Sequence, residues 1–272
     1  MEGLREFADA EKALVLQGFF KTGVGEYGEG DIFLGVSVPN VRKVVKAHGD
    51  RVSLDDVEGL LMSEIHEERL AGVLILVERF KGDPERIYNF YLANASRFNN
   101  WDLVDLSAPK IVGGYLLDKP KEEGSASLER LDSLNRRGST TSEKLSFAGD
   151  LGNEREILYK LARSENLWER RIAIISTFAF IRAGEFEDCL RISRILLKDS
   201  HDLIRKAVGW MLREVGKRDA DLLREFLREN YLDLSRVTLR YAIERFGEVE
   251  RLGWLKGELD NSFLSDVYYE HY

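Results

Sequence analysis

The chain has 272 residues, of which 44% are hydrophobic and 32% are charged, and its formal net charge is −8. This length allows a substantial buried core, and the acidic balance argues against nucleic-acid binding over the whole surface, although one basic groove can coexist with an acidic back. The single cysteine, Cys189, excludes an internal disulfide and fits a reducing cytoplasm. No run approaches the ~18 apolar residues that a membrane span needs, and no basic and apolar signal segment opens the sequence.

Helical periodicity predicts a first helix over residues 4–20. The glycine-rich segment 21–31 that follows contains a formal G-x-G-x-x-G at Gly23, Gly25 and Gly28. No predicted strand precedes this segment and no helix follows it directly. A flexible loop is therefore favoured over a dinucleotide-binding turn.

The next part of the chain predicts four helices separated by short breaks. A basic helix carries Arg42 and Lys43, and a helix pair is expected over residues 55–62 and 64–80. A further helix is expected over residues 84–95. Paired helices with short connections are typical of an all-α protein.

The stretch 99–108 (Asn-Asn-Trp-Asp-Leu-Val-Asp-Leu-Ser-Ala) predicts a helix with an unusual first turn. The side chain of Asn99 or Asn100 can cap a helix that starts there. In such a helix Trp101 and Asp105 lie on one face, because they are four residues apart. An aromatic face beside a carboxylate suits a cationic or sugar-like ligand. From this stretch alone, the alternative is a half-buried tryptophan and a surface aspartate.

An Arg-x-Ala triplet recurs with a period near 35 residues, and its arginines are Arg69, Arg171, Arg205 and Arg240. The last three are spaced by 34 and 35 residues, and the first lies 102 residues, or three such steps, before the second. This period, built from two helices, indicates an α-solenoid in which each hairpin buries its apolar face by stacking on its neighbours. It is shorter than a HEAT repeat of ~40–47 residues, so the repeat is HEAT-like.

Asp105 lies 36 residues after Arg69, where the same register predicts another triplet. Equivalent positions line one surface of a solenoid, so a carboxylate would sit within a row of guanidinium groups. The alternative is that the repeat arginines only pair with acids of neighbouring hairpins.

These patterns predict an all-α fold: a single HEAT-like repeat domain over residues 1–272, curved, with a concave basic face. The segment 119–150 breaks the periodicity and is interpreted as an insertion or a degenerate repeat. Periodicity resumes at residues 157–162. The acidic and aromatic tail, residues 261–272, is interpreted as a terminal cap or a frayed end.

Three segments resemble the DNA alkylation repair family of HEAT-like glycosylases: residues 100–105 (Asn-Trp-Asp-Leu-Val-Asp), 167–171 (Leu-Trp-Glu-Arg-Arg) and 204–214 (Ile-Arg-Lys-Ala-Val-Gly-Trp-Met-Leu-Arg-Glu). The early stretch 19–35, from Phe-Phe-Lys-Thr-Gly through Phe-Leu-Gly, resembles the same family. The resemblance covers most of the chain in matching order. It implies an active cleft formed by Trp101, Asp105, Arg171 and Trp210.

The resemblance implies that the protein hydrolyses the N-glycosidic bond of purines alkylated at N3 or N7, without flipping the base. Such a base is cationic and already a good leaving group, and its loss leaves an oxocarbenium-like sugar. Asp105 would stabilise that charge and orient a water molecule. Trp101 and Trp210 would offer flat faces to the deoxyribose, and Arg171 would hold a phosphate by a charge-assisted fork.

The expected partner is double-stranded DNA that carries alkylated purines, with no membrane partner. Phosphate contacts are expected from a basic stripe formed by Arg171, Arg205, Lys206 and Arg213, with Arg42 and Lys43 as additions. No cofactor and no metal site is expected, because the four histidines show no ligand spacing. We expect a monomer in the cytoplasm, associated with the nucleoid if the source is prokaryotic. The alternative function is a catalytically silent HEAT-like module that binds DNA or protein.

Overall fold

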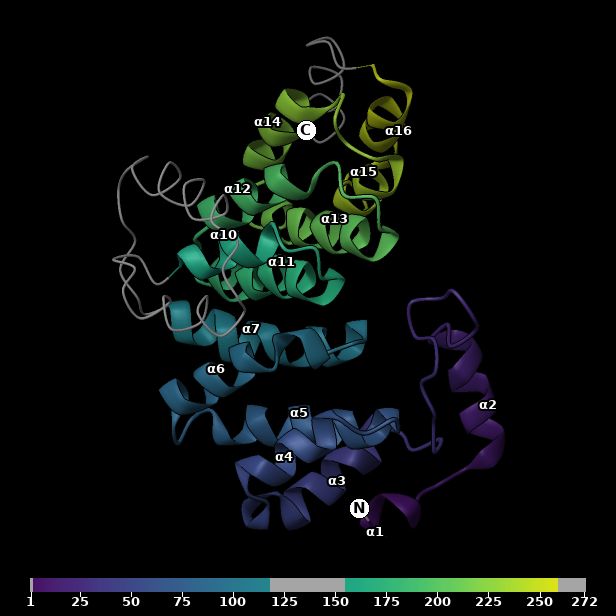
Figure 1. Ribbon diagram of the computed structural model, residues 1–272. Coiled ribbons are helices and arrows are strands. Elements are labelled where there is room, and N and C mark those ends of the chain that lie inside the picture. Colours follow the sequence, from purple (N-terminus) through teal and green to yellow (C-terminus); the bar gives the residue numbers. More distant parts are fainter. Residues whose placement is uncertain (1, 118–154, 259–272) are drawn as a thin grey trace. The chain divides into compact units, whose positions relative to one another are not determined.

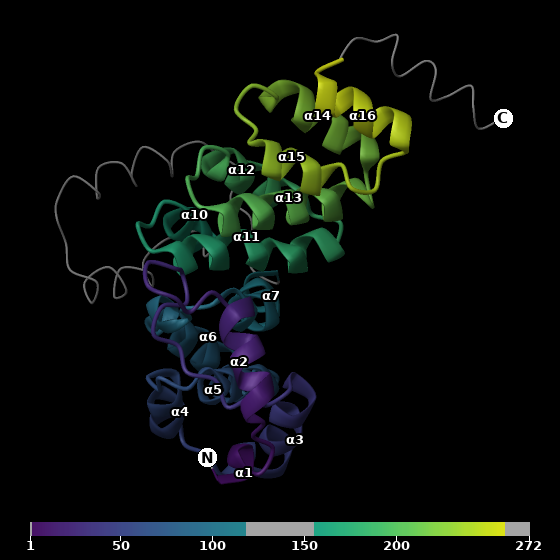
Figure 2. The same ribbon diagram turned by 90° about the vertical axis from the view of Figure 1, so that its right-hand side faces the viewer.

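The computed structural model describes residues 2–117 and 155–258, which Figures 1 and 2 show from two directions. These residues form fourteen α-helices and two short 3-10 helices and contain no strand, apart from an isolated bridge between Ile32 and Ile65. The chain divides into two compact units, Met1–Glu156 and Ile157–Tyr272. The all-α fold is confirmed, whereas a single continuous solenoid stays a prediction. The segment 119–150 and the tail 261–272 lie outside the described residues.

The first unit stacks its longer helices in one layer. Helices α3, α5 and α7 follow one another in this layer, α4 and α6 pack against it, and α1 packs on α3. Figures 1 and 2 together show α2 at one side of the stack. The helices are α1 (Glu2–Arg5), α2 (Ala10–Phe19), α3 (Val38–His48), α4 (Leu54–Leu61), α5 (His66–Arg79), α6 (Pro84–Ala93) and α7 (Trp101–Leu117), with 3-10 turns at Gly49–Arg51 and Ala95–Arg97.

The prediction of one helix over residues 4–20 is wrong, because the chain breaks at Asp9 into α1 and α2. The Asp9 side chain accepts a hydrogen bond from the Lys12 backbone N–H at 3.1 Å and so caps α2. The Asp9 backbone N–H donates to the Leu34 carbonyl at 2.9 Å, which ties the break to the loop before α3. Gly35 makes this approach possible: its φ is +82°, and a Cβ there would lie 2.0 Å from the Asp9 carbonyl oxygen.

The helix pairs expected in the first unit are confirmed, and local capping explains where they begin. Ser53 and Asp56 form a reciprocal capping box at the start of α4. Asp83 caps α6 and Pro84 occupies its first position. The basic helix also forms, as α3, with proline in its first turn. The segment 21–31 is a loop of turns, as expected.

Helix α7 runs for 17 residues and packs against α5 and α6. Leu103, Val104 and Ile111 on this helix are fully buried in the core. Pro109 lies inside the helix. Proline has no backbone N–H, so it cannot donate the helical hydrogen bond that the Asp105 carbonyl would otherwise accept.

The second unit repeats the same arrangement. Helices α11, α13 and α15 follow one another in contact, and α12 and α14 pack beside α13. This recurrence is consistent with helical repeats, and α10 confirms that periodicity resumes at residue 157. The helices are α10 (Glu156–Ala162), α11 (Leu167–Arg182), α12 (Glu187–Leu196), α13 (Asp202–Gly216), α14 (Ala220–Asn230), α15 (Arg236–Ala242) and α16 (Glu248–Lys256).

Candidate active site

The start of α7 carries Trp101 and Asp105, which are one helical turn apart and both half-buried. Asn100 starts the helix, as expected, because its side-chain oxygen accepts the Trp101 backbone N–H at 2.9 Å. Phe20 stacks on the indole of Trp101, with ring centroids 5.1 Å apart and 17° between the planes. Phe19 meets the same indole edge-on at 5.9 Å. The C-terminal end of α2 thus fixes the orientation of the Trp101 ring.

Near Asp105, the hydroxyl groups of Tyr91 on α6 and Ser107 on α7 form a buried pair between the two helices. The Tyr91 hydroxyl lies 2.8 Å from Ser107 Oγ, which itself donates to the Leu103 carbonyl at 2.6 Å. Burial raises the pKa of Tyr91, and the negative charge of Asp105 acts in the same direction. The carboxylate of Asp105 is therefore close enough to this buried pair to act on it.

Behind the first turn of α7 lies a buried charge network centred on His66. The imidazole Nε2 is 2.9 Å from Asp102 Oδ2, and Nδ1 is 3.4 Å from Asp31 Oδ2. Arg69 Nη2 lies 2.6 Å from the same Asp31 oxygen. His66 is 2% exposed and Arg69 is 3% exposed. Buried charges need partners of this kind, because the interior replaces their hydration.

The network holds its histidine and one aspartate in their charged forms. Burial opposes a charged imidazole, but the hydrogen bonds to Asp102 and Asp31 outweigh it and raise the pKa of His66 to about 9. Burial also opposes a charged Asp31, but the hydrogen bond from His66 and the charge of Arg69 hold the pKa of that carboxyl below its usual value.

In the second unit, Arg171 and Trp210 lie on the neighbouring helices α11 and α13. Arg171 is 5% exposed, and its Nη1 donates to the Leu203 carbonyl at 2.5 Å. Trp210 is half-buried, and its ring centroid is 6.1 Å from that of Phe178 on α11. Arg171 and Trp210 thus belong to the second unit and Trp101 and Asp105 to the first.

Hydrogen bonds correct the register of the repeat by one residue at α11. Arg69, Arg170 and Arg205 are each the fourth residue of their helix, and each donates to a carbonyl six residues earlier, those of Ser63, Ser164 and Asp199 at 2.6, 2.9 and 2.8 Å. Arg170, and not Arg171, is therefore the counterpart of Arg69 and Arg205. Each of these three arginines stabilises the turn that precedes its own helix, because it donates a hydrogen bond to a backbone carbonyl there.

Asp105 belongs to the next row, which holds the fifth residue of each stacked helix. The members of that row in the second unit are all cations: Arg171 on α11, Lys206 on α13 and Arg240 on α15. In the first unit the row holds Arg42 on α3, Leu70 on α5 and Asp105 on α7. A carboxylate thus stands at the helix position that carries a positive charge in every stacked helix of the second unit.

The remaining predicted DNA-binding residues differ in how far they are already engaged. Arg213 pairs with Glu244 and lies 3.9 Å from Glu214. Arg205 lies 3.4 Å from Asp202 in addition to its carbonyl contact. Lys206 and Arg42 are half-buried, and Lys43 is exposed.

The profile of the family described as DNA alkylation repair enzymes matches residues 1–137 and 145–246. The chain belongs to the DNA alkylation repair enzyme family. A solved structure described as a predicted DNA alkylation repair enzyme from Enterococcus faecalis has a similar fold, with a TM-score of 0.63 and 16% sequence identity. The match covers 89% of this chain and 97% of that one. No curated protein matches the sequence.

The sequence analysis of this DNA alkylation repair family member did not predict the network around His66, although the spacing of its residues indicates it. The spacing typical of metal ligands does not reveal this network, whereas Asp31, His66 and Asp102 are spaced by 35 and 36 residues, the period of the repeat. Groups that recur with the period of a solenoid can meet between adjacent repeats. Among the residues that the structure describes, no three His, Cys, Asp or Glu side chains gather as they would around a metal ion.

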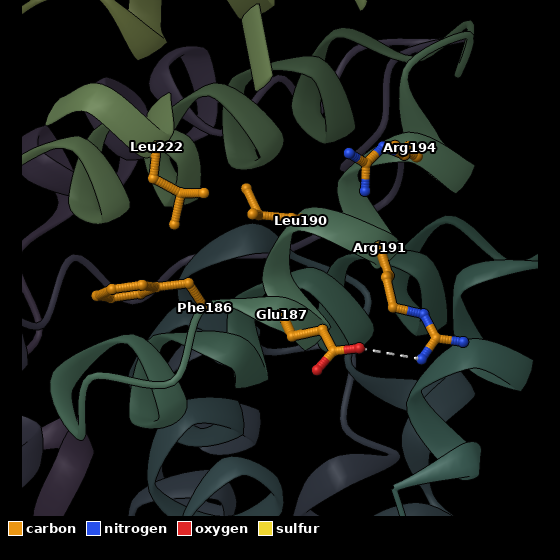
Figure 3. Close-up of a pocket in the computed structure, with 6 residues that line it drawn as sticks. All are labelled: Phe186, Glu187, Leu190, Arg191, Arg194 and Leu222. Carbon is orange, nitrogen blue, oxygen red and sulfur yellow. Dashed lines mark ion pairs between the residues drawn. The ribbon is translucent and has the colours of Figure 1, made fainter. Parts of the chain in front are cut away.

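An open groove of about 500 Å³ lies elsewhere in this family member, along α12 and α14 (Figure 3). Arg191 pairs with Glu187 at 3.6 Å, and Arg194 pairs with Glu229 at 2.9 Å. No predicted site residue lines the groove, and its charges are already balanced. Its lining consists of Phe186, Glu187, Leu190, Arg191, Arg194 and Leu222.

The described part of the chain has no helix that is both long and apolar enough to cross a membrane.

Proposed function

We propose that this protein is a DNA glycosylase that hydrolyses the N-glycosidic bond of cationic N3- or N7-alkylated purines in duplex DNA, without flipping the base. The observation that carries the proposal is the first turn of α7. There Asp105, one turn from an oriented Trp101, stands at the helix position that is cationic in the stacked helices of the second unit. Membership of the DNA alkylation repair enzyme family supports the same reaction.

In the proposed reaction, the bond between the sugar C1′ and the purine nitrogen breaks, and its electron pair neutralises the cationic base. No general acid is needed, because the alkylated base leaves as a neutral molecule. The Asp105 carboxylate stabilises the oxocarbenium-like sugar and orients the water that attacks C1′. The proton of that water passes to Asp105 or to solvent.

The two tryptophans and Arg171 hold the sugar-phosphate around that carbon. The Trp101 indole, with Phe20 stacked on it, offers a rigid flat surface to the deoxyribose, and Trp210 offers a second one. Arg171 holds a phosphate, with its guanidinium plane fixed by the Nη1 hydrogen bond to Leu203. In this proposal the protein acts as a monomer without a cofactor.

A pair of cations in the first unit supports a DNA contact there. Burial lowers the pKa of Lys110 on α7, and the charge of Arg42 on α3 lowers it further. The two positive charges are therefore close enough to repel each other, and a phosphate bound between them would relieve that repulsion. Lys110 was not among the predicted residues, because its partner lies two helices away in the stack.

The experiment is release of 7-methylguanine from duplex DNA under single-turnover conditions, with the freed base measured by chromatography. The wild-type protein should release the base, and Asp105→Asn should lower the rate by about 10²–10³, the usual effect of removing one placed electrostatic stabiliser. Affinity for DNA should stay the same or rise, because the substitution removes a negative charge from the surface that is proposed to bind phosphates. Asp55→Asn, on the exposed first turn of α4, is the control and should leave the rate unchanged.

An Asp105→Asn variant that excises at the wild-type rate would remove Asp105 from the mechanism. A wild-type protein that binds duplex DNA and releases neither 7-methylguanine nor 3-methyladenine would instead be a catalytically silent binding module.

A further inference from the structure

His66 joins the start of α5 to the start of α7. It is the first residue of α5, and its backbone N–H donates to the Ile32 carbonyl at 2.8 Å, so its own position is fixed. Its Nε2 reaches Asp102, the second residue of α7, at 2.9 Å. The other Asp102 oxygen accepts the Leu103 backbone N–H at 2.9 Å. The carboxylate of Asp102 thus links the imidazole to the backbone of the first turn of α7.

The arrangement of acceptors around the ring calls for two N–H groups. Asp102 faces Nε2 and Asp31 faces Nδ1, and a carboxylate can only accept. A neutral imidazole carries one N–H and would leave one carboxylate facing a lone pair. The imidazolium satisfies both, and it also balances the network, since Asp31 and Asp102 then oppose His66 and Arg69.

Aromatic rings enclose the imidazole and connect it to Trp101. Phe33 stacks on His66 at 4.6 Å and 19°, and Phe20 lies 4.9 Å from the same ring. Phe20 also stacks on Trp101 at 5.1 Å. Aromatic faces attract a cation, so a charged His66 draws Phe20 into the position from which it supports Trp101. His66 therefore acts on the first turn of α7 by two routes, one through Asp102 and one through Phe20.

We propose that His66 is a positioning residue for excision: its imidazolium, bridging Asp31 and Asp102, holds the first turn of α7 so that Trp101 and Asp105 keep their working orientation. This inference rests on the proposed glycosylase function. The charged groups that face His66 are Asp31 from the loop before α3, Asp102 from α7 and Arg69 from its own helix. The raised pKa of His66 agrees with this role.

The first test is the single-turnover release of 7-methylguanine by His66→Gln, which can donate to one carboxylate but cannot bridge two. We expect the rate to fall roughly tenfold to a hundredfold, since small misplacements of a reacting group have costs of that size. Affinity for duplex DNA should stay within about twofold, because chemistry and binding are separate measurements. His48→Gln, on an exposed histidine at the end of α3, should leave the rate unchanged.

A double-variant cycle distinguishes positioning from a general loss of folding. Asp102→Asn should lower the rate, and the double variant with His66→Gln should be no slower than His66→Gln alone, because both substitutions break one link. Additive losses would overturn the proposal. Asp102→Asn keeps a hydrogen-bond acceptor for the imidazole, so it also provides a milder variant if His66→Gln does not fold.

The pH profile provides a readout that a purely structural role would not change. The ratio of the wild-type rate to the His66→Gln rate should be constant near pH 7 and fall as the pH passes about 9, where His66 loses its proton. A ratio that stays constant from about pH 7 to 10 would overturn the proposal. In wild-type protein, long-range ¹H–¹⁵N NMR at pH 7 should show both ring nitrogens of His66 protonated. A single protonated nitrogen would count against the bridge without any enzyme assay.

The two proposals fail in different ways. If the wild-type protein releases no alkylated base, the glycosylase assignment fails, and the positioning role is lost with it. If the wild-type protein releases the base and His66→Gln does so at the same rate, only the role of His66 fails.

Discussion

Glu67 illustrates, at the scale of single residues, how one side chain holds the loop that supports the candidate site. It is 1% exposed, and its carboxylate accepts the backbone N–H groups of Leu34, Gly35 and Val36 at 2.9, 2.8 and 3.0 Å. These three donors belong to the loop that places Phe33 against His66. Backbone N–H groups in the interior need acceptors, so Glu67 replaces the partners that a strand or a helix would have provided.

Glu67→Gln should lower the free energy of unfolding by about 2–4 kcal/mol. The amide has one acceptor oxygen fewer than the carboxylate, and its NH₂ group would face backbone N–H groups, which are also donors. Urea unfolding measures the change. The matched control is Glu26→Gln, whose side chain accepts a single backbone N–H, that of Gly23, on the surface. Its effect should stay within about 0.5 kcal/mol. Equal effects from the two substitutions would contradict the role of Glu67.

The sequence allowed the start of α7 to be predicted at this scale but not the network behind it. The side-chain amide of Asn100 and the four-residue spacing of Trp101 and Asp105 are local features, so they can be read without a fold. The contacts of His66 with Asp31 and Asp102 join residues about one repeat apart in either direction. Such contacts depend on how the hairpins stack, which sequence periodicity predicts in general but not for individual atoms.

At the scale of elements, Gly209 allows α13 and α15 of the second unit to approach each other closely. A Cβ at this position would lie 2.5 Å from the Tyr241 Cβ and 2.6 Å from the Thr238 carbonyl oxygen, both on α15. Neither atom is the far end of a flexible side chain, so the helix axes themselves would have to separate. Gly209 also precedes Trp210, which would move with it.

Gly209→Ala should destabilise the second unit by roughly 1–3 kcal/mol. The matched control, Gly59→Ala in the first unit, should be stabilising. Gly59 lies inside α4, and a Cβ there would meet nothing within 4 Å. Gly59→Ala should therefore stabilise the first unit by about 0.5–1 kcal/mol, the helix preference of alanine over glycine. Thermal unfolding measures both changes, and the same sign for both would contradict the packing argument.

Helix boundaries were predicted well where caps are local and poorly where tertiary contacts decide them. Residues 84–95 carry their own start signals, Asp83 and Pro84, and formed a helix close to those bounds. The break at Asp9 was missed because the hydrogen bond from Asp9 to Leu34 joins it to a loop 25 residues later. A long-range hydrogen bond of this kind overrides a continuous helical pattern.

At the scale of the whole molecule, the buried network makes stability depend on pH. The pKa of His66 is raised to about 9, so its contribution is complete below about 6.5 and is lost as the pH rises through about 9. The pKa of Asp31 is lowered, so its contribution is present above its ordinary value and is lost as the pH falls below that value. Between those limits both groups stabilise the folded first unit.

Raising the pH from about 6 to 10 should therefore lower the stability of the first unit by an amount on the order of 3 kcal/mol. Urea titrations that follow NMR amide signals from α5 and α7 measure this change. His66→Gln should remove most of this dependence. An equally steep loss in that variant would assign the effect to other groups.

The proposed DNA contacts of the two units can be tested by the salt dependence of DNA binding. Lys43→Ala in the first unit and Lys206→Ala in the second should each reduce the slope of log affinity against log salt by about one, and the double variant by about two. Lys198→Ala removes an exposed lysine that lies 3.0 Å from Asp233 and should leave the slope unchanged. Anisotropy titrations measure these slopes. A slope that responds to only one of the two lysines would mean that one unit alone contacts the duplex.

Pro109 has a consequence for amide hydrogen exchange in α7. Without its N–H, the ladder of helical hydrogen bonds is interrupted after the second turn, so the stretch with Trp101 and Asp105 can open locally without unwinding residues 110–117. Protection of the early amides then depends on what holds the first turn from outside, including the link from Asp102 to His66 and the stacking of Phe20 on Trp101. The two ends of one helix are therefore expected to exchange as two separate cooperative segments.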